Sequence, residues 1–269
     1  MGLLHTMRDY VKFRKVVEKI ETGACDERCG CYEARRPPLV YLSGPSASTV
    51  LISESPWDLP STKHVSITGN KEDLDRSLNS ALTEGELHAP IHEFIIRSFQ
   101  PLFEGETRDL ATRFLDAVYW THVGKKSFKA PRWRKSTERF SAGRKCATNL
   151  LIEEISAVEP SLLITLSSIA TQVLLGHSFM ELLERHRGIG GELLEIRDVI
   201  EDRRESLLAR ALFSSPAVFS PDWKCQLAVL PNPSCTAKRW QREAMKGGVM
   251  QAIERRIGDR VKSRVASSR

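Results

Sequence analysis

The sequence has no run of 18 apolar residues, so it contains no candidate for a membrane-spanning helix. Residues 1–21 have the pattern of an amphipathic, charged helix rather than of a signal sequence with an apolar centre. There is no internal repeat or low-complexity segment. A glycine-rich phosphate loop is also lacking, which disfavours a generic nucleotide-binding α/β protein. We therefore expect an intracellular, cytoplasmic protein with no membrane partner.

The composition is compatible with one large domain. A chain of 269 residues, 41% of them apolar, can bury a sizeable core, and this length favours one domain over two. There are 40 Lys and Arg against 34 Asp and Glu, a net charge of +6 that favours phosphate partners if it is clustered on one face. In a reducing compartment the six cysteines are expected to be thiols or metal ligands rather than disulfides. We expect a monomer with a single domain over residues 1–269, in which residues 1–38 form an N-terminal helix and cysteine segment.

Short apolar runs alternate with helical patterns along the chain. Strands are predicted at residues 39–42, 49–53, 118–123, 161–166 and 226–230. Helices are predicted at residues 89–103, 107–117, 144–158, 169–175 with Gly176 as C-cap, 181–212 as a charged helical region, and 237–261. This alternation predicts an α/β fold, a three-layer α/β/α sandwich around a mainly parallel central sheet. Pro56 stops the second strand and leaves polar residues at its carboxyl end, where open α/β sheets bind ligands.

Three segments carry a resemblance to a known family. They are VLISESPW at residues 50–57, the passage from VYWTHVGK at residues 118–125 through Cys146 and Pro160 to LITLSSIATQVLLG at residues 163–176, and LPNPS at residues 230–234. In this order they resemble the uracil-DNA glycosylase superfamily, above all its thermostable iron–sulfur branch. The first is similar to a strand ending in Gly-Glu-(Ala/Gly)-Pro-Gly. The second is similar to a strand, a cluster cysteine and a strand-to-helix passage that opens Leu-Gly-x-x-Ala and closes Leu-Gly. The third is similar to the closing motif, which is His-Pro-Ser in most branches and Asn-Pro-Ser in the mismatch-specific branch. The resemblance covers roughly residues 25–255 and implies the glycosylase fold.

The resemblance implies catalysis by a water molecule placed beneath the sugar of a flipped nucleotide. Ser55 stands where other branches carry Asp or Asn, so we expect Asp58 to hold the water, with Glu54 as the next candidate. Alternatively, Glu54 only bonds loop amides and Asp58 caps a helix. Asn232 would face the glycosidic bond and Ser234 would hold a phosphate, unless the segment is a simple proline-rich turn. A neutral Asn lacks the ionisable imidazole of the His-Pro-Ser branches, so it should stabilise the leaving base less.

Base recognition is implied at His122, which falls where the family carries an asparagine that contacts uracil's carbonyl and ring N–H together. A neutral imidazole offers one donor and one acceptor on opposite sides of its ring, so it cannot copy that contact. The alternative is a histidine satisfied within the core. Ser55 and Trp57 are further candidates for base recognition.

DNA binding is expected at basic residues near two of the motifs. Residues 125–135 are basic and carry Phe128 and Trp133, a combination that suits a nucleic-acid surface but also a solvated one. The residues expected to contact DNA are Lys125, Lys126, Ser234, Lys238 and Arg239.

The cysteines suggest a metal centre. Three of them crowd into residues 25–31, and Cys146 lies fourteen residues before Pro160, as a cluster ligand does in the iron–sulfur branch. The third family position falls near Lys126, which cannot ligate iron. The resemblance therefore implies a 4Fe–4S cluster on Cys25, Cys29, Cys31 and Cys146, with zinc or no metal as alternatives.

The expected function is a monofunctional DNA glycosylase acting on a damaged or modified pyrimidine. No lysine lies in the first and closing motifs to form a Schiff base, so a lyase step is not expected. Because His122 replaces the asparagine, a cytosine with a bulky 5-substituent, as in modified phage DNA, is expected to be a better substrate than uracil. The role would then be defence against phage. The alternatives are ordinary uracil repair and a catalytically weak nucleic-acid-binding protein on the same fold.

Overall fold

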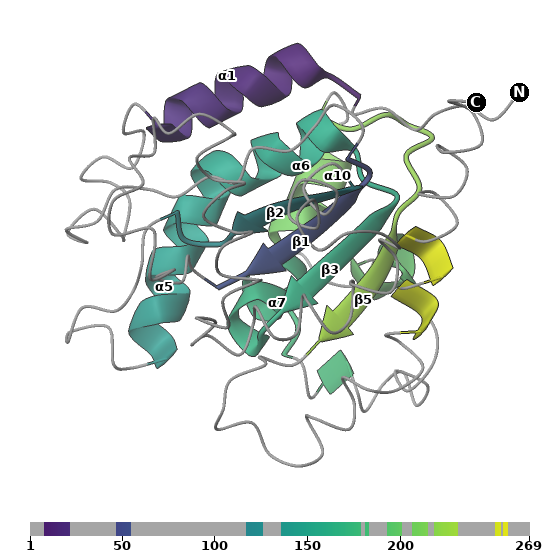
Figure 1. Ribbon diagram of the computed structural model, residues 1–269. Coiled ribbons are helices and arrows are strands. Elements are labelled where there is room, and N and C mark those ends of the chain that lie inside the picture. The colour runs from purple at the N-terminus through teal and green to yellow at the C-terminus, as the bar shows by residue number, and fades with distance from the viewer. Residues whose placement is uncertain are drawn as a thin grey trace, which may run out of the picture.

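The protein has an α/β fold built on a five-stranded, mainly parallel sheet, as a computed structural model shows (Figure 1). The strands are β1 (Thr49–Ser53), β2 (Val118–His122), β3 (Leu162–Leu166), β4 (Leu194–Glu195) and β5 (Gln226–Leu230), in the order β2-β1-β3-β5-β4. β4 alone is antiparallel and pairs with β5 at the edge. The structure describes residues 8–21, 47–54, 117–125, 136–178, 181–182, 193–200, 206–214, 218–230, 251–253 and 255–257.

Both faces of the sheet are buried, as expected for parallel strands. Successive side chains alternate between the faces, so the strand register sorts them into two sets. Val50, Tyr119 and Leu163 belong to the main hydrophobic cluster under the helices. On the opposite face, Leu51 and Trp120 are also at most 1% exposed. The near-continuous apolar sequence of the strands follows from this double burial.

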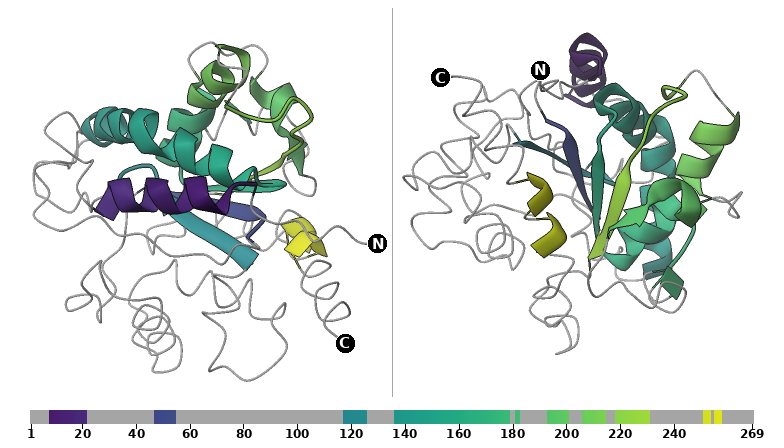
Figure 2. Two further views of the ribbon diagram at one scale, coloured as in Figure 1. Left: turned by 90° about the horizontal axis from the view of Figure 1, so that it is seen from above. Right: turned by 90° about the vertical axis from the view of Figure 1, so that its right-hand side faces the viewer.

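The described helices pack mainly against one face of the sheet. They are α1 (Tyr10–Glu21), α5 (Ser136–Cys146), the π-helical turn η5 (Ala147–Leu151), α6 (Ile152–Val158), α7 (Ser168–Leu175), α9 (Ile196–Ile200) and α10 (Leu207–Ser214). Figure 2 shows α5, α6, α7 and α10 on one side of the sheet and the helical residues 251–253 and 255–257 on the other. Ile253 and Ile257 are buried there, at 0% and 2% exposed. Within the described residues, no helix is long and apolar enough to cross a bilayer.

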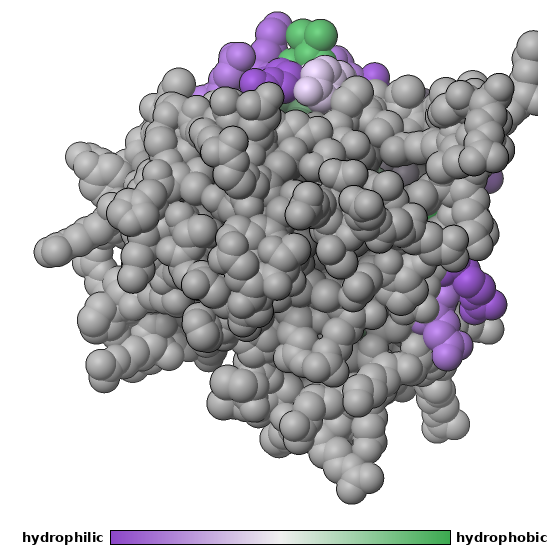
Figure 3. Space-filling view, viewed as in Figure 1, coloured by the Kyte–Doolittle hydropathy of each residue, from purple (hydrophilic) through white to green (hydrophobic). Residues whose placement is uncertain are grey.

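Helix α1 packs through one apolar stripe. Phe13, Val16, Val17 and Ile20 are all buried, at the spacing that puts side chains on one face of a helix. The ring of Phe13 meets the ring of Tyr119 edge to face, with 4.8 Å between centroids. The outer surface of α1 is mostly hydrophilic, with a small hydrophobic spot (Figure 3). This helix therefore covers the sheet as the amphipathic sequence predicts.

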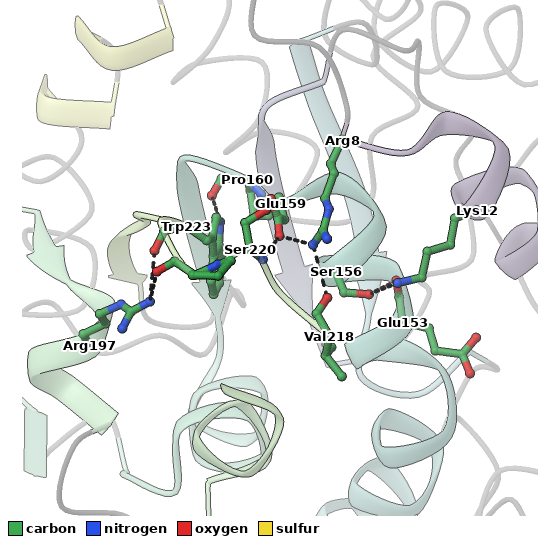
Figure 4. A network of polar contacts seen from close by, with 11 residues as sticks. Arg8, Lys12, Glu153, Ser156, Glu159, Pro160, Arg197, Val218, Ser220 and Trp223 are labelled. Carbon is green, nitrogen blue, oxygen red and sulfur yellow. Dashed lines mark hydrogen bonds and ion pairs between the residues drawn. The ribbon is translucent and has the colours of Figure 1, made fainter. Parts of the chain in front are cut away.

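A polar network lies at the edge of the sheet where the parallel strands begin (Figure 4). Glu159 is the C-cap of helix α6, with a left-handed φ of 43°, and its carboxylate pairs with the Arg8 guanidinium. The same carboxylate accepts the Ser220 backbone N–H at 2.5 Å and hydroxyl at 2.9 Å. Trp223 Nε1 donates to the Pro160 carbonyl at 2.9 Å. These contacts tie the segment before β5 to the turn before β3, at the edge opposite the carboxyl ends of the strands.

The predicted elements that the structure describes are confirmed, apart from two corrections. β1 and β5 have the predicted bounds, β2 and β3 are one residue shorter, and Gly176 is the left-handed C-cap of α7. The helix expected from residue 144 begins at residue 136. The region 181–212, expected to be helical, contains the short strand β4. The predicted elements at 39–42 and 89–103, residues 107–116 of the next helix, and all of the predicted helix 237–261 except the helical residues 251–253 and 255–257, lie outside the described residues.

Candidate functional site

The carboxyl ends of the four parallel strands lie in one row across the sheet. Ser53 pairs with His122 on one side and with Leu166 on the other, and Leu166 pairs with Leu230. The chain winds from β1 outward to β2 in one direction and from β3 to β5 in the other. The strand order therefore reverses between β1 and β3, which is where open α/β sheets form their binding crevice.

A pair of main-chain hydrogen bonds extends this edge beyond the strands. Val123 donates its N–H to the Ser53 carbonyl at 2.9 Å, and Gly124 donates to the Glu54 carbonyl at 3.0 Å. Glu54 is 8% exposed. The predicted carboxylate residue is therefore held beside the turn that follows β2.

Three side chains form a compact polar cluster on the sheet face opposite the main helix cluster. The Ser53 hydroxyl lies 2.5 Å from His122 Nδ1, and Trp120 Nε1 donates to the same hydroxyl at 3.2 Å. The rings of Trp120 and His122 are tilted, with centroids 5.7 Å apart. Ser53 and His122 are 0% exposed. The strand register explains the cluster, because Ser53 and His122 are direct neighbours.

The His122 imidazole is kept neutral by its surroundings. Burial lowers its pKa well below the ordinary value, because water no longer solvates the charged ring. The positive charge of Lys125 lowers the pKa further. A neutral imidazole carries one proton, so one ring nitrogen donates a hydrogen bond and the other accepts one.

Lys125 and Glu154 form a buried ion pair on the other face of the sheet. Lys125 is 1% exposed and Glu154 is 0% exposed. The Lys125 ammonium donates to Thr121 Oγ1 at 2.7 Å, to the His122 carbonyl at 2.7 Å and to Glu154 Oε2 at 2.9 Å. Thr121 in turn donates to Glu154 Oε2 at 2.5 Å. All three ammonium protons are engaged, which is the condition for holding such a charge in the interior.

This ion pair also acts on a neighbouring phenol. Burial, followed by the negative charge of Glu154, raises the pKa of Tyr119 well above its ordinary value. Tyr119 therefore stays protonated under Phe13 of α1, and it provides no acid or base chemistry near neutral pH.

Ser167 connects β3 to α7 at the point where the strand order reverses. Its backbone has φ 151° and ψ 158°, a conformation that residues other than glycine rarely adopt. Its hydroxyl accepts the Ala170 N–H at 3.0 Å as the N-cap of α7. In the family pattern Leu-Gly-x-x-Ala, the glycine falls at this position.

The cysteine of the second motif is placed by a close helix approach. A Cβ on Gly143 would lie 2.8 Å from Val123 Cγ1, so the absence of a side chain lets α5 come close to the end of β2. Cys146, three residues later, is 0% exposed, and the Lys125 backbone N–H donates to its Sγ at 3.4 Å. Among the described residues, no three His, Cys, Asp or Glu side chains gather to bind a metal.

One expected site residue has a different environment from the one predicted. Lys125 was expected on a DNA-binding surface, but its ammonium is buried and engaged by Glu154, so this expectation is corrected. A charged residue in a basic stretch gives no sequence sign of burial when its partner lies 29 residues away. Glu54, His122 and Cys146 lie at the carboxyl edge or beside it.

The other expected site residues lie outside the part of the chain that the structure describes. They are Cys25, Cys29, Cys31, Ser55, Trp57, Asp58, Lys126, Asn232, Ser234, Lys238 and Arg239. Their assignments stay predictions.

Sequence reasoning missed Ser53 and Glu154. Ser53 could have been found as a polar residue ending an apolar strand. Glu154 could have been found because it shares a helix face with Leu151 and Val158, at spacings of three and four residues. Comparison with known proteins adds no assignment, since no protein-family model and no curated protein matches the chain.

Proposed function

We propose that this protein is a monofunctional DNA glycosylase that hydrolyses the N-glycosidic bond of a flipped pyrimidine and leaves an abasic site. The observation that carries the proposal is the row formed by Ser53, His122 and Leu230 at one edge of the sheet. Each of these residues belongs to a different segment that resembles the uracil-DNA glycosylase superfamily. Segments far apart in the sequence therefore end at the same edge, as a shared active site requires.

The spacing of the strands suits a nucleotide. Neighbouring strands lie about 4.8 Å apart, so the ends of β1 and β5, separated by β3, are roughly 10 Å apart. A base with its sugar fits between groups at this separation. The burial of both sheet faces supports the three-layer α/β/α form of the fold.

We assign the hydrolytic roles to residues that follow these strand ends. Asp58 would position the water, with Glu54 as the alternative, and Asn232 would stabilise the departing base. Ser55 and Trp57 would contact the base. The residues proposed to hold the DNA backbone are Lys126, Ser234, Lys238 and Arg239.

The absence of a lyase step rests on the surroundings of Lys125. It is the lysine nearest to His122 among the described residues, and its ammonium is fully engaged by Thr121, Glu154 and a backbone carbonyl. A Schiff base needs a neutral amine that can reach the sugar. Lys125 meets neither requirement, which supports excision by water.

We further propose that the substrate is a modified pyrimidine, with a cytosine bearing a bulky 5-substituent as the leading candidate. His122 stands where the family has an amide, and an imidazole cannot contact uracil's carbonyl and N–H together. Removal of such a base would serve defence against modified phage DNA. Ordinary uracil repair and DNA binding without catalysis are the competing functions.

The direct test is a single-turnover excision assay. Matched duplexes carrying uracil, a hydroxymethylated cytosine or a glucosylated cytosine are incubated with the protein, and abasic sites are cleaved with alkali. We expect excision of a modified cytosine and poor excision of uracil. Asp58→Asn and Asn232→Ala should each lower the rate by about 10²-fold or more with little change in DNA affinity. Rapid uracil excision with none of modified cytosine would return the protein to uracil repair, and cleavage of no duplex would leave DNA binding alone.

We also propose a 4Fe–4S cluster on Cys25, Cys29, Cys31 and Cys146. The support from the structure is the Cys146 thiol, which is buried and accepts a backbone N–H, as cluster sulfur ligands commonly do. Protein purified anaerobically should be brown, and Cys146→Ser should lose iron, whereas Cys225→Ser, at another buried cysteine, should keep it. Elemental analysis that finds zinc, or neither metal, would overturn the cluster.

A further inference from the structure

We propose that Ser53 and Trp120 are positioning residues that fix His122 as the tautomer protonated at Nε2, so that the ring offers a pyrimidine a hydrogen-bond donor and no acceptor. The tautomer assignment follows from the contacts of the Ser53 hydroxyl. Its consequence for substrate choice rests on the proposed glycosylase function, in which His122 contacts the base.

The assignment begins with Trp120. An indole N–H can only donate, so the contact of 3.2 Å between Trp120 Nε1 and the Ser53 hydroxyl uses one lone pair of that oxygen. The single hydroxyl proton of Ser53 must then go to another acceptor. Two lie within reach, His122 Nδ1 at 2.5 Å and the Thr121 carbonyl at 3.5 Å.

The two distances decide between these acceptors. A hydroxyl hydrogen bond is normally 2.5–3.0 Å long, so the contact with the Thr121 carbonyl is too long to be a good bond. If Nδ1 carried the ring proton, the Ser53 hydroxyl would accept twice and its own proton would have only that long contact. A buried donor without a good partner is costly. The arrangement in which Ser53 donates to Nδ1 gives each proton a short partner, and it places the proton of the neutral ring on Nε2.

Lys125 keeps the ring in this form from the other side of the strand. Its ammonium binds the His122 carbonyl at 2.7 Å, so a positive charge is fixed beside the residue. Adding a second proton to the ring would place two cations close together in a buried region. Burial and this charge both lower the pKa of His122, in agreement with a neutral ring.

A donor-only ring selects between pyrimidines. Position N3 of cytosine has a lone pair, whereas N3 of uracil carries a proton. With Nδ1 occupied by Ser53, the imidazole can donate to the cytosine atom but has no lone pair for the uracil N–H. In a buried site, the imidazole N–H and the uracil N–H would face each other with no acceptor between them, which should lower excision by about 10- to 100-fold. Cytosine-type bases, and not uracil-type bases with the same 5-substituent, are therefore the substrate class that the cluster fits.

The tautomer is tested by nitrogen NMR of the full-length protein labelled with ¹⁵N-histidine, with the His122→Asn variant used to assign the signal. We expect His122 Nδ1 to have the shift of an unprotonated ring nitrogen and Nε2 that of a protonated one. Ser53→Ala should abolish this pattern and give mixed tautomers. Ser161→Ala is the matched control, because Ser161 is a buried serine directly before β3, at the opposite edge of the sheet, with its hydroxyl 3.4 Å from the Ser48 carbonyl. A wild-type spectrum with the proton on Nδ1 would overturn the proposal whatever the variants do.

The substrate consequence is tested with duplexes carrying 5-hydroxymethylcytosine or 5-hydroxymethyluracil, which share the 5-substituent. The wild type should prefer the cytosine form by about 10-fold or more, and His122→Asn should bring the ratio towards one. Preference for the uracil form would overturn the selection while leaving the glycosylase function intact. Excision of neither form, and of neither uracil nor glucosylated cytosine, with the expected NMR pattern, would refute the glycosylase function and leave the tautomer assignment standing.

Discussion

Removing one partner of the buried Lys125–Glu154 pair should destabilise the protein far more than removing one partner of the exposed Lys19–Glu153 pair. Lys125→Met deletes three hydrogen bonds and leaves the Glu154 carboxylate, which is 0% exposed, beside the Thr121 hydroxyl without its cation. Breaking a buried pair in this way costs about 3–5 kcal/mol. That is a large part of a typical unfolding free energy of roughly 5–15 kcal/mol.

The adjacent residue of α6 provides the control. Lys19 pairs with Glu153 at 2.7 Å, but their side chains are 54% and 42% exposed. Lys19→Met should therefore cost no more than about 1 kcal/mol, because water solvates both charges when they separate. The two variants remove the same chemical group and differ in burial.

A double replacement tests the reasoning further. Lys125→Met with Glu154→Leu removes both charges and leaves Thr121 and one carbonyl without those partners, at a cost of about 1–3 kcal/mol. This is less than either single variant. Urea unfolding followed by tryptophan fluorescence gives each free energy. If Lys125→Met costs no more than Lys19→Met, or if the two single costs simply add, the ammonium is not held as described.

Two other predictions concern the residues around this pair. Gly143→Ala should gain about 1 kcal/mol of helix propensity but lose about 1–3 kcal/mol to overpacking against Val123. Urea unfolding should therefore show a net destabilisation, and adding Val123→Ala to the same chain should relieve part of it. The pKa of folded His122 lies well below the unfolded value of about 6.5, so the unfolded chain gains a proton first as the pH falls. The stability due to the neutral ring is present above pH 6.5 and is lost below it, by up to about 1.4 kcal/mol per pH unit, and His122→Asn should lose that slope.

The strands were predictable because their signal is local. Residues 49–53 and 226–230 are short apolar runs bounded by turn residues, and the structure has strands with these bounds. β4 was not predictable in this way. It has two residues, Leu194 and Glu195, which are extended because they pair with β5. A strand defined by its partner leaves no periodic pattern in its own sequence.

The polar clusters at the site depend on contacts that the sequence does not encode locally. His122 was predicted as a site residue from the family pattern, but its partner Ser53 lies 69 residues earlier and is identified only by the register of β1 with β2. Lys125 shows the same limit. Its positive charge predicted an exposed position, but its environment is set by Glu154 of α6, which also accepts a hydrogen bond from Thr121 of β2.

Ser167 gives a further prediction, because its backbone has a conformation that favours glycine, while its hydroxyl caps a helix. Its φ of 151° is about 30° from fully extended, so the strain is at the low end of roughly 1–3 kcal/mol. Ser167→Ala keeps the strain and loses the hydrogen bond to Ala170, at a cost of about 1 kcal/mol. Ser167→Gly loses the cap at a cost of only about a few tenths of a kcal/mol and removes about 1 kcal/mol of strain, while the greater freedom of the unfolded glycine costs about 0.5–1 kcal/mol. Its unfolding free energy should thus be close to that of the wild type.

Ser206 is the control for this prediction. Its hydroxyl also caps a helix, accepting the Ala209 N–H at 3.0 Å, and it also donates to the Leu174 carbonyl at 2.8 Å. Its φ is not positive, so Ser206→Gly removes these bonds without relieving strain and should destabilise the protein by about 1 kcal/mol or more. If urea unfolding shows Ser167→Gly to be as harmful as Ser206→Gly, then β3 does not enter α7 through a glycine-like conformation.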